Sequence, residues 1–128
     1  MRGFDYIFAK QTAWAKANKI ELVGSKLEKG RPAYTKCISD NIFEGLMDEV
    51  EKEISAGDGG ELVGPIPKIS AVHSSSALGV NIFQYWRRIG RIPIIAAACG
   101  LCTNGSVASD KIVFEDIYKI TTVRLKIL

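Results

Sequence analysis

The stretch that decides the fold is residues 73–86, His-Ser-Ser-Ser-Ala-Leu-Gly-Val-Asn-Ile-Phe-Gln-Tyr-Trp, where a serine cluster leads directly into an amphipathic run. A serine hydroxyl just before Ala77 can accept a hydrogen bond from the free amide groups of a first helical turn. Apolar residues then recur at helical spacing, at Leu78, Ile82, Tyr85 and Ile89. The pattern predicts a helix in the middle of the domain with this apolar face buried.

Polar residues in the same stretch are the first candidates for function. His73, the only histidine, precedes Ser74 and Ser75, but adjacent His and Ser seldom reach the geometry of a catalytic triad, and no acid is placed to orient the ring. We therefore expect the histidine to bind backbone where the helix begins and the serines to cap it. Asn81 lies inside the apolar run, where an unpartnered amide costs about 1–3 kcal/mol, so it should bond to a neighbouring loop, and residues 57–61 are a candidate.

The chain before this stretch predicts another helix and a connector. Phe4–Asn18 has a helical pattern in which Phe4, Ile7, Phe8 and Trp14 share an apolar face. Residues 24–36 are rich in lysine and contain a glycine and a proline, which indicates a loop across the surface.

A second helix and a glycine-rich turn follow the connector. Asp40 or Asn41 can cap the helix, and Gly57 is expected to end it in the left-handed conformation. Three glycines among residues 57–60 suit a turn that needs positive φ or a close approach. Asp58 and Glu61 could offer oxygen ligands to a metal, or the segment could be an ordinary turn. We favour the turn, because the acids of an EF-hand and the Gly-Lys-Ser/Thr of a P-loop are absent.

The remainder of the chain predicts one buried helix and two late strands. Residues 94–101 are apolar on all sides and follow Pro93, which suits a first helical turn. Residues 111–118 and 122–128 have the composition and alternation of strands. We therefore expect an α+β chain, mainly helical, forming a single domain over residues 1–128. Since two strands alone are marginal, the domain is expected to be incomplete.

Composition limits the class of protein. Apolar residues make up 47% of the 128 residues and charged residues 24%, which suits one domain with a sizeable core. Residues 1–64 carry nine basic and eleven acidic side chains, whereas residues 65–128 carry eight and three. The basic second half permits contact with DNA, although a solvated surface explains it too. Without an apolar run long enough for a membrane span, or a signal-peptide pattern, we expect a cytoplasmic protein that does not contact membranes.

Three cysteines raise a metal alternative. Cys99 and Cys102 have the spacing of a zinc pair, and Cys37 and His73 could complete four ligands. An odd number of cysteines favours reduced thiols instead. We expect Cys99 to pack in the core and Cys102 to lie in a loop.

Seven short pieces, taken in order, resemble one known family. They are Gly24-Ser25-Lys26, Tyr34-Thr35, Asp40-Asn41-Ile42-Phe43, Gly57-Asp58-Gly59-Gly60-Glu61-Leu62, His73-Ser74-Ser75-Ser76-Ala77-Leu78, Asn81-Ile82-Phe83 and Phe114-Glu115. Together they look like the N-terminal part of a bacterial nuclease family of the restriction-endonuclease-like, PD-(D/E)XK type. The resemblance runs from about Trp14 to about Glu115.

The resemblance implies a helix-rich front half of an α/β domain that cleaves DNA with magnesium. In such sites an Asp and a Glu hold the metal, and a Lys orients or activates the water. This sequence has no Pro-Asp pair and no Glu-x-Lys triplet, so Glu115 is the one catalytic residue that the resemblance carries over. A single carboxylate is not expected to bind Mg²⁺ tightly.

Two functions from different classes therefore stand as expectations. In the first, the chain is the N-terminal portion of a DNA endonuclease and is inactive by itself. In the second, it is a non-catalytic helical domain for interaction or self-association, with the edge of the last strand as a contact between copies.

Overall fold

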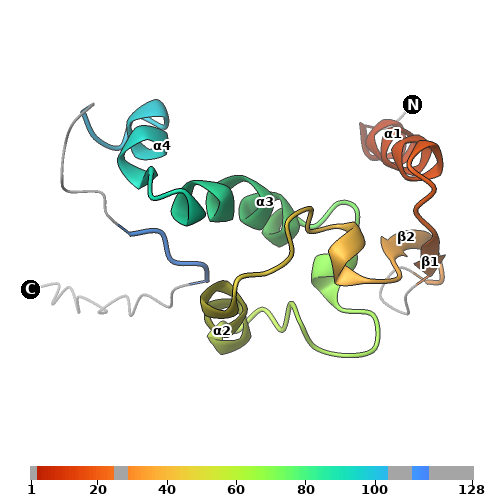
Figure 1. Ribbon diagram of the computed structural model, residues 1–128. Helices are drawn as coiled ribbons and strands as arrows, with labels where there is room; N and C mark the ends of the chain where they lie inside the picture. The colour runs from red at the N-terminus through yellow and green to blue at the C-terminus, as the bar shows by residue number, and fades with distance from the viewer. Residues whose placement is uncertain (1–2, 25–28, 104–110, 116–128) are drawn as a thin grey trace, which may run out of the picture.

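The computed structural model describes residues 3–24, 29–103 and 111–115, and over these ranges the chain is mixed α+β and mainly helical (Figure 1). The helices are α1 (Gly3–Ala17), α2 (Asp48–Ala56), α3 (Ser75–Arg88) and α4 (Ile92–Ala98). Strands β1 (Leu22–Gly24) and β2 (Pro32–Thr35) pair, and two 3₁₀ helices, η2 (Ile38–Asp40) and η3 (Lys68–Ser70), lie in the connections. No helix in the described ranges is long and apolar enough to cross a membrane.

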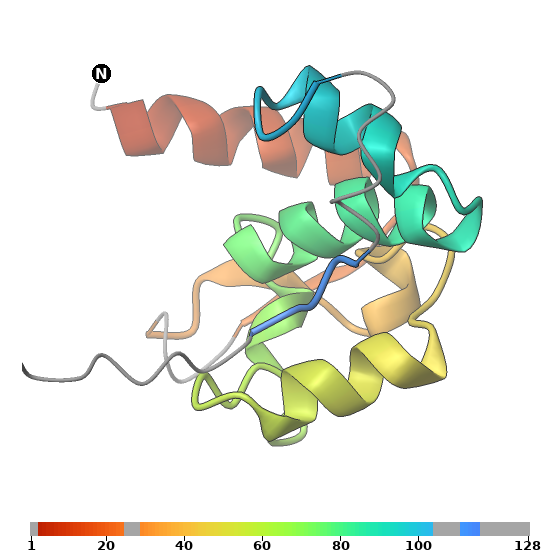
Figure 2. The same ribbon diagram turned by 90° about the vertical axis from the view of Figure 1, so that its left-hand side faces the viewer.

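Helix α3 lies between the other helices. In both Figure 1 and Figure 2, α1 and α4 lie above α3 and α2 lies below it. The core fills the space between α2 and α3, with the 3₁₀ helix η3 and part of the loop after η2 closing it. Its buried members are Ile42, Val50, Ile54, Ile69, Ala77 and Val80.

The start of α3 is predicted correctly and its buried face is not. Ser74 caps the helix by accepting a hydrogen bond from the Ala77 N–H at 3.1 Å. The face turned to the core carries Ala77, Val80 and Gln84, because small side chains let α3 lie close to its neighbours. The stripe expected to be buried is exposed instead, by 62% at Leu78, 42% at Ile82, 43% at Tyr85 and 43% at Ile89. We call these four residues the α3 stripe.

The predicted surface loop over residues 24–36 is wrong where residues 32–35 form strand β2, which pairs antiparallel with β1. Leu22 pairs with Thr35, Val23 with Tyr34, and the register shifts at Gly24. A Cβ atom at Gly24 would collide with the carbonyl of Gly30, so the bulge needs glycine there. Strand β2 buries its last three residues, and this burial outweighs the loop-like composition around it.

Helix α1 has the predicted extent but stands largely clear of the body. Ala15 is its buried residue, whereas Phe4, Ile7 and Trp14 of the expected apolar face are 48%, 54% and 37% exposed. The Gln11 side chain ties the helix to the body through a 2.7 Å hydrogen bond to the carbonyl of Val72. Much of the apolar surface of α1 thus has no cover in the described chain.

Helix α2 begins later than predicted and ends differently. Its first residue is Asp48, and the segment before it contains the 3₁₀ helix η2. Asn41 does not cap a helix, because its side chain donates to the carbonyls of Ile69 at 2.7 Å and Ala71 at 2.9 Å. Gly57 does end α2, but with φ −73° and ψ 160° it is extended and not left-handed.

The last described segments also differ from the prediction. Helix α4 has its proline in the first turn as expected, yet Ile94 and Leu101 are 45% and 77% exposed, so the helix is not buried on all sides. Residues 111–115 form no strand. Residues 116–118 and the strand expected over 122–128 lie outside the described ranges, and so does the proposed contact between copies at that strand.

Candidate functional site

The Asn81 side chain bonds to a loop, as predicted, but to a different one. Its oxygen accepts from the Phe43 N–H at 3.0 Å, and its amide nitrogen donates to the Asn41 carbonyl at 2.8 Å. The expected contact with the glycine-rich turn is wrong, because the turn follows α2 and the amide faces the loop that precedes it. Asn81 therefore has a structural role that joins two pieces of the family resemblance.

Gln84 repeats this arrangement one turn later and was missed by the sequence analysis. It accepts from the Met47 N–H at 2.9 Å and donates to the Gly45 carbonyl at 2.7 Å. The side chain is 2% exposed, and both of its polar atoms are satisfied. Asn81 and Gln84 together form what we call the amide clamp, which holds the backbone of the segment leading into α2.

The glycine-rich turn receives the side chain of Glu115, the residue carried over as catalytic. A Cβ atom at Gly57 would lie 2.7 Å from Glu115 Oε2, and one at Gly59 would lie 3.0 Å from the same oxygen. These are shorter than normal contacts, so glycine is required for the carboxylate to lie over the turn. Glu115 itself has φ 58°, in the left-handed region, which a non-glycine residue seldom adopts.

Glu61 and Lys68 lie at the same turn. The position of a Cβ at Gly59 is 3.4 Å from Glu61 Oε1 and 3.0 Å from Glu115 Oε2, so two carboxylates approach one point. The Lys68 ammonium donates to the Gly59 carbonyl at 2.5 Å. Asp58 is exposed in the turn. The fold therefore brings the Glu115 carboxylate, from a segment far along the sequence, to the turn that carries Glu61 and to which Lys68 binds.

An ion pair that the sequence analysis missed anchors the segment that carries Glu115. Arg87 Nη1 of α3 lies 2.8 Å from Glu53 Oε2 of α2 and 3.3 Å from the Ile112 carbonyl. The same carboxylate oxygen accepts from the Phe114 N–H at 3.1 Å. Both charged side chains are about four-fifths buried, with 20% of each exposed, so residues 112–114 are fixed to α2 and α3.

Charge and burial act in opposite directions on Glu53. Burial by itself raises the pKa of this carboxyl, because it disfavours the charged form. The hydrogen bonds from Arg87 and the Phe114 amide, with the positive charges of Arg87 and Lys111, more than offset burial and leave the pKa below its ordinary value of 4.5. The carboxylate is therefore ionised at neutral pH and can hold the anchor.

We call Glu61, Lys68 and Glu115, at the glycine turn, the turn-side cluster. The polar residues where α3 begins do not belong to it. Ser74 is used as the helix cap, and Ser75 is exposed in the first turn. The His73 ring lies edge-on to Tyr34, with ring centroids 6.2 Å apart, and to Phe4 at 6.4 Å. Of the three, Ser74 is therefore the residue whose predicted capping role is confirmed.

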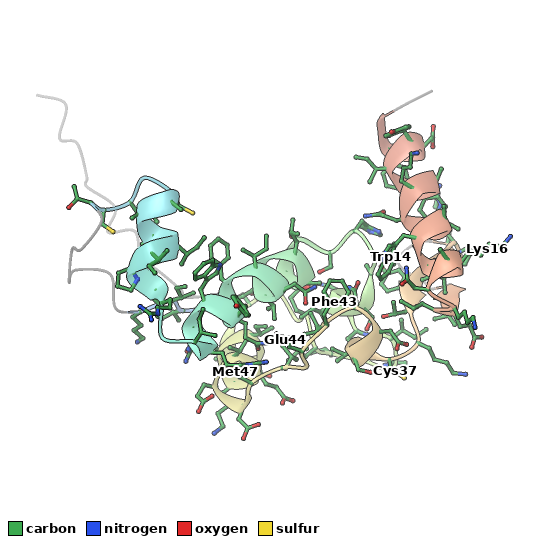
Figure 3. All side chains as sticks on the ribbon, turned by 45° about the horizontal axis from the view of Figure 1, so that its top comes forward. Trp14, Lys16, Cys37, Phe43, Glu44 and Met47 are labelled. Carbon is green, nitrogen blue, oxygen red and sulfur yellow. The ribbon has the colours of Figure 1, made fainter. Side chains whose placement is uncertain are left out.

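A groove of about 540 Å³ lies on the other side of α3, between that helix and α1. Trp14 and Phe43 face each other across it, with ring centroids 6.1 Å apart (Figure 3). Leu78 and Ile82 of the α3 stripe line it, and Lys10 is its charged residue. The groove is thus mainly apolar and continuous with the exposed stripe.

The four residues of the zinc alternative are not assembled. Cys37 lies at the opposite end of the molecule from α4, which Cys99 directly follows (Figure 3). Cys99 is exposed and Cys102 half-buried, so the predicted core position of Cys99 is wrong. Within the described ranges no group of three or more His, Cys, Asp or Glu side chains is placed to hold a metal ion.

The turn-side cluster has a limited chemistry by itself. Two carboxylates and a lysine can attract a cation or bind a polar group, but Mg²⁺ in proteins also needs waters or substrate oxygens to complete octahedral coordination. Glu61 and Glu115 thus supply at most two of the ligands that a magnesium ion would need. Comparison with family models, with curated proteins and with solved structures found no match to this chain.

Proposed function

We propose that this chain is the N-terminal part of a magnesium-dependent DNA endonuclease of the restriction-endonuclease-like type, and that it does not cleave DNA by itself. In this proposal Glu115 belongs to the catalytic edge of the whole domain. The remaining acid and the Glu-x-Lys triplet come from chain that is absent from these 128 residues. The chain described here then supplies the helical support and positions one carboxylate.

The observation that carries the proposal is the convergence at the glycine turn. Two separate pieces of the resemblance, Gly57–Leu62 and Phe114–Glu115, lie against each other, and the glycines leave the room that the Glu115 carboxylate occupies. Leu62 and Phe114 also pack on the same core cluster. This contact supports the proposal, because the residues of one catalytic site must lie close together in the fold.

Magnesium does not fit the described residues as a resident ion. Glu61 and Glu115 offer two carboxylates, and no third His, Cys, Asp or Glu from the described ranges joins them in a ligand group. We therefore derive no catalytic step through the metal. In this proposal Glu61 and Glu115 place negative charge beside the turn. Lys68 binds the Gly59 carbonyl of the same turn.

Plasmid cleavage tests the proposal directly. The 128-residue chain and a version extended by the neighbouring reading frames are incubated with supercoiled DNA and Mg²⁺ or Mn²⁺. We expect cleavage by the extended chain alone, and its loss in the extended Glu115→Gln variant. Glu51→Gln, on the exposed face of α2, is the matched control and should cleave normally.

Two other outcomes would overturn the proposal. Cleavage by the short chain would show that the catalytic acids lie within it, and cleavage by neither chain would favour the non-catalytic interaction domain. Full activity of the extended Glu115→Gln variant would remove Glu115 from the site.

A further inference from the structure

The α3 stripe and the groove beside it form one apolar surface that the described part of the chain leaves uncovered. The stripe residues are spaced four, three and four apart, which is the spacing of a seam that packs against another helix. Two aromatic residues from other elements, Trp14 and Phe43, extend the surface and are 37% and 69% exposed. Folded chains seldom leave such a patch open unless it binds something.

We propose that a second copy of this chain covers this surface, with the two α3 helices antiparallel about a twofold axis. Trp14, Phe43, Leu78 and Ile82 form the hollow half of the surface. Tyr85 and Ile89, at the C-terminal end of the stripe, are each 43% exposed and do not line the groove, and they form the half that in this proposal projects into the partner copy. A twofold axis places the projecting half of each copy in the hollow half of the other, as an isologous interface requires.

The area is sufficient for such a pair. The exposed fractions of the six residues, between 37% and 69%, add up to about three whole residues. At about 200 Å² for a whole large apolar residue, the value for an aromatic side chain, the surface exposes roughly 600 Å² per copy. Two copies would then bury about 1,200 Å², the low end of the range for specific interfaces. Helices α1 and α4 lie on one side of α3 (Figure 1, Figure 2), and each carries further exposed apolar residues.

The charges also permit the surface to meet itself. The stripe contains no charged residue, so facing copies do not repel each other there. At the C-terminal end of α3, Arg87 is paired with Glu53 at 2.8 Å and Arg88 with Glu44 at 2.7 Å. These two arginines are balanced within the chain, whereas Lys10 at the groove and the exposed Arg91, two residues after Ile89, must keep their charged ends in water at the rim of the contact.

Sedimentation of the purified chain over a concentration series tests the proposal. We expect the wild-type chain to form a dimer and Leu78→Glu to remain monomeric, because a buried unpaired carboxylate opposes association. Val63→Glu is the control, since Val63 is 74% exposed in the loop after the glycine turn and should leave the dimer unchanged. Circular dichroism would show that both variants keep their helices. A monomeric wild-type chain, or a dimeric Leu78→Glu variant, would overturn the proposal.

Disulfide trapping tests the antiparallel arrangement. In a background with Cys37, Cys99 and Cys102 replaced by serine, a mixture of Leu78→Cys and Ile89→Cys chains should form a mixed disulfide dimer. Crosslinking of Leu78→Cys with itself, and not with Ile89→Cys, would show a parallel pair and would refute the arrangement. Both readouts are masses and do not depend on nuclease activity.

Discussion

Replacing Gln84 by methionine separates the hydrogen bonds of the amide clamp from its packing. Methionine has nearly the same shape as glutamine but leaves the Met47 N–H and the Gly45 carbonyl without their partners at 2.9 and 2.7 Å. A buried polar group that loses its partner costs about 1–3 kcal/mol. Both backbone groups lie in half-buried residues, where water replaces part of each bond, so we expect Gln84→Met to lower the free energy of unfolding by about 2–3 kcal/mol.

Asn81→Leu is the comparison that makes the test sharp. Asn81 bonds to the loop in the same way, but the Phe43 N–H belongs to a residue that is 69% exposed and can bond to water, whereas the Asn41 carbonyl belongs to a residue that is 8% exposed and loses its partner. We expect a loss of about 1–3 kcal/mol, from the Asn41 carbonyl alone.

Urea unfolding followed by circular dichroism measures both losses, and amide hydrogen exchange at Met47 and Phe43 reports the two bonds separately. Gln84→Met should speed exchange at Met47 and leave Phe43 protected, and Asn81→Leu should do the reverse. Equal stability of Gln84→Met and the wild-type chain, with Met47 still protected, would refute the clamp.

Three further predictions follow from single contacts. Gly79→Ala should raise the free energy of unfolding by about 0.5–1 kcal/mol, because its Cβ meets nothing within 4 Å in the middle of α3; a loss of stability would contradict the open space. Gly57→Ala should expose the Phe114 amide to hydrogen exchange, since its Cβ would lie 2.8 Å from that of Glu115, and unchanged protection would show that the turn does not need the glycine. The Glu53 ion pair should stabilise the chain above pH 4.5 and lose this effect as the pH falls through the lowered pKa of Glu53. Glu53→Gln should therefore flatten the acid side of the stability profile, and an identical profile would exclude the anchor.

For helix α3, the sequence predicts where the helix starts better than which of its sides is buried. Ser74 and the apolar period that follows it locate the start of α3 because a cap and a period are local features. Which side of α3 is buried depends on the partners, and here the small residues Ala77 and Val80 pack against α2 while the larger ones stay outside. The large apolar residues of this pattern therefore form an exposed stripe and not the core.

Elements that depend on distant contacts were missed for the same reason. The hairpin forms in a segment with loop-like composition because Ala33 and Tyr34 are buried against Ala71. Asn41 was read as a local cap, yet its amide is used by two carbonyls about thirty residues away. In the candidate site, Glu115 and the glycine turn could be named from the sequence. The ion pair between Glu53 and Arg87 could not, because it depends on how α2 packs against α3, and a local sequence pattern contains no information on that.

The amide clamp binds only main-chain groups of the segment before α2 and makes no hydrogen bond to the side chains of that segment. Asn81 fixes Phe43 by its N–H, while the ring of Phe43 projects to the proposed contact surface. The side chain at position 43 therefore has little influence on the free energy of folding. Substitutions there can change which partner is recognised while the backbone course stays the same, so this position can evolve new binding preferences at little cost in stability.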